Sequence, residues 1–296
     1  MIRSLFYKNI STRNKYLIHT FCFLLCIGFI SCSSDDYIDY ITNNTNNQAN
    51  TPPIINNKDT LYLAHWNIGH FSLGKYFDTS INDDNFDEKL TLYKELLDTL
   101  KIDLLGLCEY NQTFDIRGRN TYDLLLKDYP FYLIGKKHAY NCNAIFYKYT
   151  MPITICKYFD SMVQTRYYLC TSFIYKEIEV KFVESHLDWD QGEWGMICRQ
   201  DQMMELAQTF KDDQYVIICA DFNSSNTKEY QCFIDAGFSI AFDDQTSIGT
   251  FTTIDNIIYK GFRIVDKSIV KDYTLSDHPL YKAAFMLNTN NYNHGS

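Results

Sequence analysis

Short apolar runs recur along residues 60–287, and they constrain the fold more than any other feature of this chain. Each run is bounded by polar or turn-forming residues and is too short for most helices, which is typical of β-strands. We therefore expect strands over residues 61–68, 104–108, 131–133, 144–147, 168–174, 180–185, 216–220, 256–259 and 281–287.

Two longer segments carry apolar residues at helical spacing instead. Residues 87–100 place Leu90, Tyr93 and Leu97 on one face, and residues 196–210 follow the same pattern. A shorter helix is expected over residues 229–236. Many strands with few helices predict an α+β sandwich, in which two packed sheets are flanked by helices.

The N-terminal region is basic and then apolar. Residues 1–16 contain four basic residues and no acid, and an apolar run follows over residues 17–30. Such a run spans roughly 21 Å as a helix, short of the ~30 Å hydrocarbon core, so a cleaved signal peptide is a better interpretation than a membrane span. It ends in Phe29-Ile30-Ser31-Cys32, which resembles a bacterial lipobox.

We therefore expect residues 1–31 to be a signal peptide and Cys32 to carry lipid. The protein would be an exported lipoprotein anchored in the membrane, expected in the outer membrane on its periplasmic or cell-surface side. An ordinary signal peptide with an incidental cysteine is the alternative. Residues 32–58 are polar and low in complexity and predict a flexible tether. One domain over residues 59–288, expected to be monomeric, and a polar tail over 289–296 follow.

The chain contains ten cysteines, three of them before residue 33. No CxxC pair occurs, so neither a zinc ribbon nor a thioredoxin-type motif is supported. Cys108, Cys170 and Cys219 lie in apolar runs, where cysteine is usually a small core residue. The sequence allows one or two disulfides, and it does not indicate which cysteines would pair.

The charge balance argues against one class of function. With 27 basic and 36 acidic residues, the net charge is −9, which argues against a protein that coats nucleic acid through non-specific charge. An enzyme that binds phosphate through a cation remains compatible with it.

Chemically useful side chains cluster where the apolar runs stop. Asn67 closes the first run, Glu109 the second and His186 a later one. Asn67 can face a cation or a phosphate oxygen, although a turn asparagine before glycine is the ordinary alternative. A carboxylate after a buried strand suggests a metal ligand. His186 suits a phosphoryl contact or a structural hydrogen bond.

Three further places follow later in the chain. Asp221 and Asn223 lie two residues apart after a strongly apolar run and would project to the same side. Asp255 opens another run, and the pair Asp277-His278 precedes the last one. Adjacent strand residues point to opposite faces, so Asp255 is a better orienting partner for His278 than Asp277 is.

Together these motifs resemble the endonuclease/exonuclease/phosphatase superfamily, the metal-dependent phosphoesterases related to pancreatic-type deoxyribonucleases. The resemblance covers residues 60–287 and rests on HWNIGH, IDLLGLCEY, NAIFYK, SHLDW, ICADFNSS, TIDNIIY and LSDHPL, which occur in family order. It implies a four-layer α/β-sandwich with two mainly antiparallel sheets between helices. Cys108, Ala220 and Asn256 depart from residues common in the family but remove no catalytic group.

The resemblance also implies a metal site. Asn67 and Glu109 match metal-site positions, with Glu109 the main ligand of Mg²⁺ or Mn²⁺, and Asp277 matches an acid often placed near a metal. Asn67 would also contact the substrate. Oxygen ligands suit such hard cations.

The catalytic residues are implied in the same way. His186 would contact the scissile phosphate, while Asp221 and Asn223 would position the nucleophile and the phosphate. His278 would be the catalytic histidine and Asp255 the acid that orients it. Whether His278 or Asp221 is the general base stays open.

The expected function is hydrolysis of phosphodiester bonds by a nuclease-like enzyme. A phosphomonoesterase or a lipid phosphodiesterase of the same fold, acting on an inositol phosphate or on sphingomyelin, is the alternative. Arg117 and Arg119 would reach a nucleic-acid backbone or form a solvated face. A catalytically inactive surface-binding protein is a further alternative, although a dead copy would be expected to lose at least one catalytic group.

Overall fold

The computed structural model describes residues 40–42, 54–55, 58–71, 86–110, 129, 131–135, 142–148, 153–160, 166–247, 250–272 and 275–288. All of them belong to one compact unit, residues 37–296. Cys32, Arg117 and Arg119 lie outside the described residues, as do the expected signal peptide and the polar tail.

The first sheet contains seven strands among the described residues, in the order β1-β5-β6-β4-β3-β16-β15. Their bounds are Tyr40–Thr42 (β1), Phe131–Gly135 (β5), Cys142–Tyr147 (β6), Leu104–Tyr110 (β4), Leu61–Asn67 (β3), Leu280–Leu287 (β16) and Phe262–Val270 (β15). Of these pairings only β3 with β4 is parallel.

The second sheet follows the order β11-β14-β10-β9-β8-β2, and β7 also pairs with β8. Its strands are Ser239–Ile240 (β11), Asp255–Lys260 (β14), Val216–Asp221 (β10), Ile178–His186 (β9), Tyr167–Tyr175 (β8), Ile54–Ile55 (β2) and Ile153–Tyr158 (β7). The pairs β9–β10 and β2–β8 are parallel and the others antiparallel. A separate hairpin joins β12 (Gln245–Ser247) to β13 (Thr250–Phe251).

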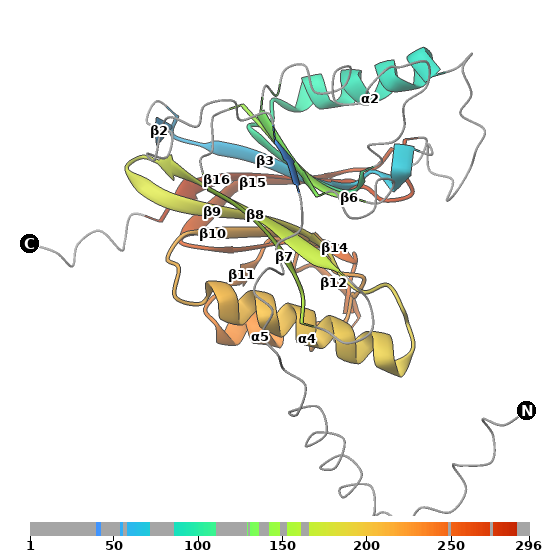
Figure 1. Cartoon of the computed structure of the whole chain (residues 1–296), viewed down its shortest axis with the longest axis vertical. Coiled ribbons are helices and arrows are strands. Elements are labelled where there is room, and N and C mark those ends of the chain that lie inside the picture. The colour runs from blue at the N-terminus through green and yellow to red at the C-terminus, as the bar shows by residue number, and fades with distance from the viewer. Residues whose placement is uncertain are drawn as a thin grey trace, which may run out of the picture. The chain divides into compact units, whose positions relative to one another are not determined.

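The sheets pack face to face between helices, which gives four layers (Figure 1). Helix α2 (Phe86–Leu100) covers the first sheet, and α4 (Glu193–Phe210) with α5 (Gln231–Asp235) covers the second. Alternation along each strand supplies the two faces. In β3, for example, Leu61 and Leu63 enter the core between the sheets, while Ala64 and Trp66 pack in the cluster that contains α2.

The expected fold class is confirmed, and each expected strand and helix is present. Two short strands, β1 and β2, lie within residues 32–58, which the polar composition assigned to a flexible tether. Strand β1 pairs with β5 at the edge of the first sheet, and β2 pairs with β8 at the edge of the second. The described helices include none that is long and apolar enough to cross a membrane.

Candidate active site

The layer between the two sheets is apolar along most of its length and becomes polar at one end. In β3 the inward residues continue from Leu61 and Leu63 to His65 and Asn67. In β9 the same alternation leads from Val180 and Phe182 to Glu184 and His186, and in β10 from Ile217 and Cys219 to Asp221. Every one of these polar residues is buried.

Sheet topology explains why they meet. The carboxyl ends of the parallel pair β3–β4 carry Asn67 and Glu109, and those of β9–β10 carry His186 and Asp221. Strand β14 runs antiparallel to β10, so its first residue, Asp255, pairs with Asp221. Strand β16 runs antiparallel to β3, so the segment before it, with His278, reaches the same end.

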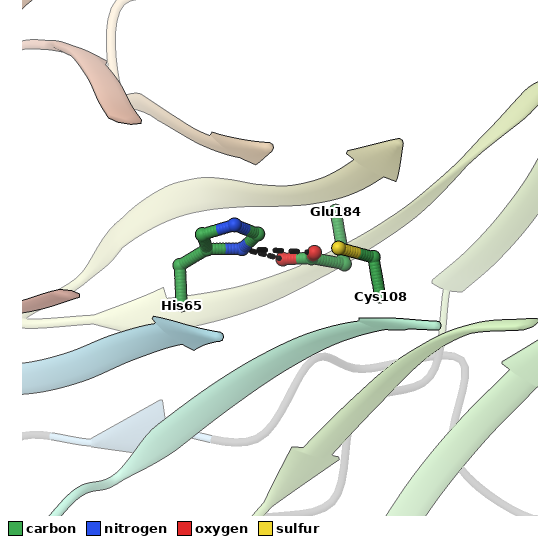
Figure 2. Close-up of side chains that lie close together, drawn as sticks. All are labelled: His65, Cys108 and Glu184. Carbon is green, nitrogen blue, oxygen red and sulfur yellow. Dashed lines mark hydrogen bonds and ion pairs between the residues drawn. The ribbon is translucent and has the colours of Figure 1, made fainter. Parts of the chain in front are cut away.

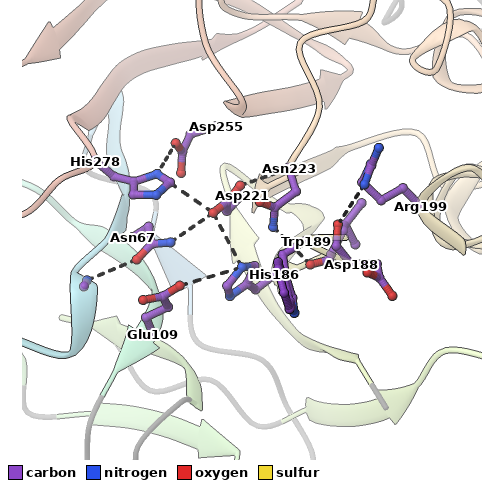
Figure 3. A network of polar contacts seen from close by, with 12 residues as sticks. Asn67, Glu109, His186, Asp188, Trp189, Arg199, Asp221, Asn223, Asp255 and His278 are labelled. Atoms are coloured by element: carbon purple, nitrogen blue, oxygen red, sulfur yellow. Dashed lines mark hydrogen bonds and ion pairs between the residues drawn. The ribbon is translucent and has the colours of Figure 1, made fainter. Parts of the chain in front are cut away.

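His278 and Asp255 form a closely hydrogen-bonded pair. The Nδ1 atom of His278 lies 2.7 Å from Oδ2 of Asp255 (Figure 3). Burial alone would lower the pKa of His278, but the charge and hydrogen bond of Asp255 raise it to about 10. The backbone of the histidine is also fixed, because Trp66 Nε1 donates to its carbonyl oxygen at 3.0 Å.

Asp221 lies at the centre of the polar network. Its Oδ2 accepts a hydrogen bond from Asn67 Nδ2 at 2.9 Å and lies 3.5 Å from His186 Nε2 and 3.9 Å from His278 Nδ1. Its Oδ1 accepts the backbone N–H of Asn223 at 2.9 Å. Burial and the nearby charge of Asp255 raise the pKa of Asp221 above its usual value.

Glu109 reaches the site through an irregularity in β4. Strict alternation would place it with Leu105 and Leu107, which pack in the cluster under α2. The register with β6 shifts between Leu107 and Tyr110, and Glu109 has a φ of 52°. A bulge of this kind re-aims a side chain. As a result, Oε2 of Glu109 lies 3.0 Å from His70 Nε2, and Oε1 lies 3.9 Å from His186 Nε2.

Three residues of the site have left-handed backbone conformations, which also occur away from the site at Lys101, Lys176 and Glu177. Glu109, His70 and Asn223 all have φ values between 51° and 56°, in the left-handed region that residues with a Cβ rarely occupy. Such conformations cost of order 1–3 kcal/mol each and persist where surrounding contacts enforce them, often at functional sites.

The donor set fits a hard divalent cation. Glu109 and Asp221 bring two buried carboxylates to the same imidazole nitrogen of His186, with the amide of Asn67 between them. Burial would raise the pKa of Glu109, but the hydrogen bond and charge of His70 hold it below its usual value, so the group is a carboxylate. Glu109 could hold Mg²⁺ or Mn²⁺ with Asp221 beside it. Asn67 would join them only by turning its Oδ1, which here accepts the Gly69 N–H, towards the cation.

His186 and Asn223 complete the predicted constellation. Burial, together with nearby positive charges, lowers the pKa of His186 well below its usual value, so the ring is neutral. Its Nδ1 is buried and has no hydrogen-bond partner among the described residues. Asn223 Nδ2 donates to the carbonyl oxygen of Leu187 at 3.1 Å, which ties the loop after β10 to the loop after β9.

Asp277 differs from the other predicted site residues. Its side chain is exposed, and it is not part of the hydrogen-bonded network that the structure describes. Its negative charge nevertheless contributes to the raised pKa of His278.

Three buried residues of the site were not predicted from the sequence: His65, His70 and Glu184. His65 contacts Asp255 and Glu184, as Figure 2 shows for the Glu184 side, and His70 contacts Glu109. Burial raises the pKa of Glu184 to about 7 against the effect of His65; burial would lower the pKa of His65, but Glu184 and Asp255 raise it to about 10. A signal existed, because His65 and Glu184 each lie two residues before a predicted site residue and so share its face.

No protein-family model and no curated protein matches this sequence, whereas solved structures match it in fold. An endonuclease/exonuclease/phosphatase from Beutenbergia cavernae aligns with a TM-score of 0.62 and 12% identity over 78% of this chain and 72% of that chain. The catalytic domain of human Nocturnin with a bound sulfate anion gives 0.59 and 17% over 85% and 98%. TDP2 of D. rerio complexed with a single-strand DNA product gives 0.56 and 15% over 77% and 99%.

At these identities the likeness concerns the fold alone. The chain has the four-layer fold of the endonuclease/exonuclease/phosphatase proteins, with a cluster of buried carboxylates and histidines where the parallel pairs β3–β4 and β9–β10 end.

Proposed function

We propose that the protein is a metal-dependent hydrolase of phosphodiester bonds. One observation carries the proposal: Glu109, Asp221 and the hydrogen-bonded pair His278–Asp255 converge at one end of the intersheet layer. The likeness of fold to phosphoesterase structures supports it.

The chemistry follows from the charges. A divalent cation held by Glu109 and Asn67 would neutralise charge that develops on the phosphoryl oxygens. His278, protonated beside Asp255, donates a hydrogen bond to a phosphoryl oxygen, and neutral His186 donates another. A protonated imidazole cannot accept a proton, so Asp221 is the better candidate to take the proton of the attacking water.

For the substrate, we propose nucleic acid, in keeping with the nuclease-like function expected from the sequence. Exposed aromatic side chains after β9 support this choice, because Trp189 is 61% exposed and Trp194, at the start of α4, is 67% exposed. Gln191 Nε2 donates to the carbonyl oxygens of both Trp189 and Asn223, at 3.1 and 3.4 Å, which keeps Trp189 beside the site. An exposed indole next to a phosphoester site, as at Trp189, suits base stacking. TDP2, of similar fold, was crystallised with a single-strand DNA product.

A lipid phosphodiester is the second candidate. It is favoured by the same exposed indoles, which also suit a membrane interface, together with the proposed lipid anchor at Cys32. Replacement of Cys32 by serine should move the exported protein from the membrane fraction to the soluble fraction. Unchanged membrane association of Cys32→Ser would refute the anchor.

The decisive experiment is a substrate panel on the protein comprising residues 37–296. We expect hydrolysis of bis(p-nitrophenyl) phosphate and of single-stranded DNA with Mg²⁺ or Mn²⁺, and none with EDTA. Sphingomyelin and inositol phosphates test the lipid and monoester alternatives. Folded, metal-supplied protein that is inert on every substrate would instead indicate a binding protein.

A matched pair of variants links activity to the site. Glu109→Gln should lose activity by about 10²–10⁴-fold, because it removes a carboxylate next to the proposed cation. Glu179→Gln changes an exposed acid at the opposite end of β9 and should leave activity unchanged.

A further inference from the structure

Behind the pair His278–Asp255, a second pair of buried residues extends the hydrogen-bonded chain into the layer between the two sheets. His65 Nε2 lies 3.1 Å from Oδ1 of Asp255. His65 Nδ1 lies 3.0 Å from Oε1 and 3.2 Å from Oε2 of Glu184. His65 and Glu184 have no exposed surface. The chain therefore runs from His278 through Asp255 and His65 to Glu184.

This arrangement uses both oxygens of Asp255. Oδ2 faces His278 and Oδ1 faces His65, so the carboxylate is held from both sides. His65 comes from β3 in one sheet, whereas Asp255 and Glu184 come from β14 and β9 in the other. The contacts therefore fix the distance between the two sheets at the point where the site lies.

We propose that His65 and Glu184 are positioning residues that hold Asp255, and through it His278, in the orientation that hydrolysis requires. The proposal rests on the function proposed above. Neither residue has exposed surface that a substrate could touch, so their effect on hydrolysis would pass through Asp255.

A glycine in the facing strand supports this role. A Cβ atom added to Gly106 would lie 1.9 Å from Oε2 and 2.8 Å from Cδ of Glu184. The absence of a side chain at Gly106 in β4 therefore makes the space that the Glu184 carboxylate occupies against His65.

The same residues do not form a convincing metal site. His65, Cys108 and Glu184 bring one potential ligand atom each to within 4.8 Å of one another (Figure 2). Both ring nitrogens of His65, however, already have carboxylate partners, and burial raises the pKa of the Cys108 thiol well above its usual value. A neutral thiol is a poor metal ligand.

Glu184→Gln tests the proposal with little change in shape. We expect kcat to fall by about 10–100-fold, the usual effect of losing a partner that orients a functional group, and KM to stay within about twofold. In the His278→Asn background, Glu184→Gln should cause almost no further loss, because residues that act as a unit are not additive. Asp103→Asn is the control, since Asp103 is a buried acid just before β4, far along the strand from Glu109.

A proton NMR measurement provides a readout that does not depend on activity. The Nδ1 proton of His278, hydrogen-bonded to Asp255, should give a downfield resonance that is identified by its absence in His278→Asn. Glu184→Gln should shift or broaden this resonance, and Asp103→Asn should not. If Glu184→Gln does not fold, the paired variant His65→Leu/Glu184→Leu removes both partners and leaves no unpaired buried charge between them.

The outcomes are distinct. A kcat loss that multiplies fully with that of His278→Asn, or an unchanged His278 resonance, would refute the positioning role. If the Glu109→Gln protein still binds stoichiometric metal and the His65→Leu/Glu184→Leu protein does not, His65 and Glu184 belong to a metal site and are not positioning residues. If the wild-type protein hydrolyses none of the substrates, the proposed function fails, and the resonance alone decides whether His65 and Glu184 hold His278.

Discussion

The pKa of His278 depends on its partner in the site, Asp255. Its pKa of about 10 lies above the ordinary histidine value of 6.5, because the effect of Asp255 outweighs that of burial. A pKa that is raised by folding stabilises the folded state fully below pH 6.5, and this contribution is lost as the pH rises towards 10.

We therefore predict that the metal-free protein loses stability between pH 6.5 and 10. His65, whose pKa is raised in the same way, contributes to the loss in the same direction. Urea denaturation in EDTA should show a steeper decline for the wild type than for His278→Asn, with a difference of at most about 1.4 kcal/mol per pH unit. Equal slopes for the two proteins would contradict the prediction.

The site residues differ in how far the sequence could predict them. Asn67, His186 and Asp221 end apolar runs, where a polar residue stands out. His65 and Glu184 lie inside such runs, where a single polar residue reads as an interruption, and their pairing spans 119 positions of the chain. The direction of Glu109 could not be predicted at all, since it depends on a bulge that local sequence does not specify.

At the scale of elements, buried strands were predictable and exposed ones were not. Strand β10 is buried throughout and reads as a continuous apolar run. Strand β15 is mostly exposed, and Asp266, Lys267 and Ser268 divide its apolar residues into two short pairs, so no continuous apolar run marks it. Its pairing with β16 is a backbone property of the sheet edge.

Helix α4 offers a direct test of the layered packing. Leu206 is fully buried among residues of the second sheet, while Met204, two positions earlier, is 50% exposed. Leu206→Ala should lower the free energy of unfolding by about 2–5 kcal/mol, because it leaves a cavity. Met204→Ala should change it by less than about 0.5 kcal/mol. Thermal denaturation of the two variants would contradict the packing if their melting temperatures fell equally.

The loop between β9 and α4 carries the prediction about substrate. Trp189→Ala should raise KM for single-stranded DNA by about fivefold or more, the lower end of what loss of stacking on one base costs, with little change in kcat. KM for bis(p-nitrophenyl) phosphate should change much less, because this ester carries no nucleobase. Ile234→Ala, which changes an exposed apolar residue on α5, is the control. Equal KM changes for both substrates would exclude base stacking.

At the scale of the whole molecule, the apolar residues are distributed as the four layers of the fold require. Apolar residues fill three clusters, one between the sheets and one beneath the helices on each side, and the intersheet layer ends in the polar site. The sequence predicted this class because strand number and helix number are local signals. The sequence alone left disulfides open, and here the structure decides: all seven cysteines after residue 33 are free.

The free thiols give a prediction for the entire domain. Six of the seven cysteines are buried, and Cys232 is partly exposed. In the protein comprising residues 37–296, a thiol reagent should therefore modify at most Cys232 in the native state and all seven cysteines after unfolding without a reductant. The reaction of Cys232 should be slow near neutral pH, since burial raises its pKa to about 11. Cys232→Ser should abolish the native reaction and leave six thiols after unfolding. A count lower than seven in the unfolded wild type would show that a disulfide forms in the protein, and the packing around that cysteine pair would then have to differ from the one described.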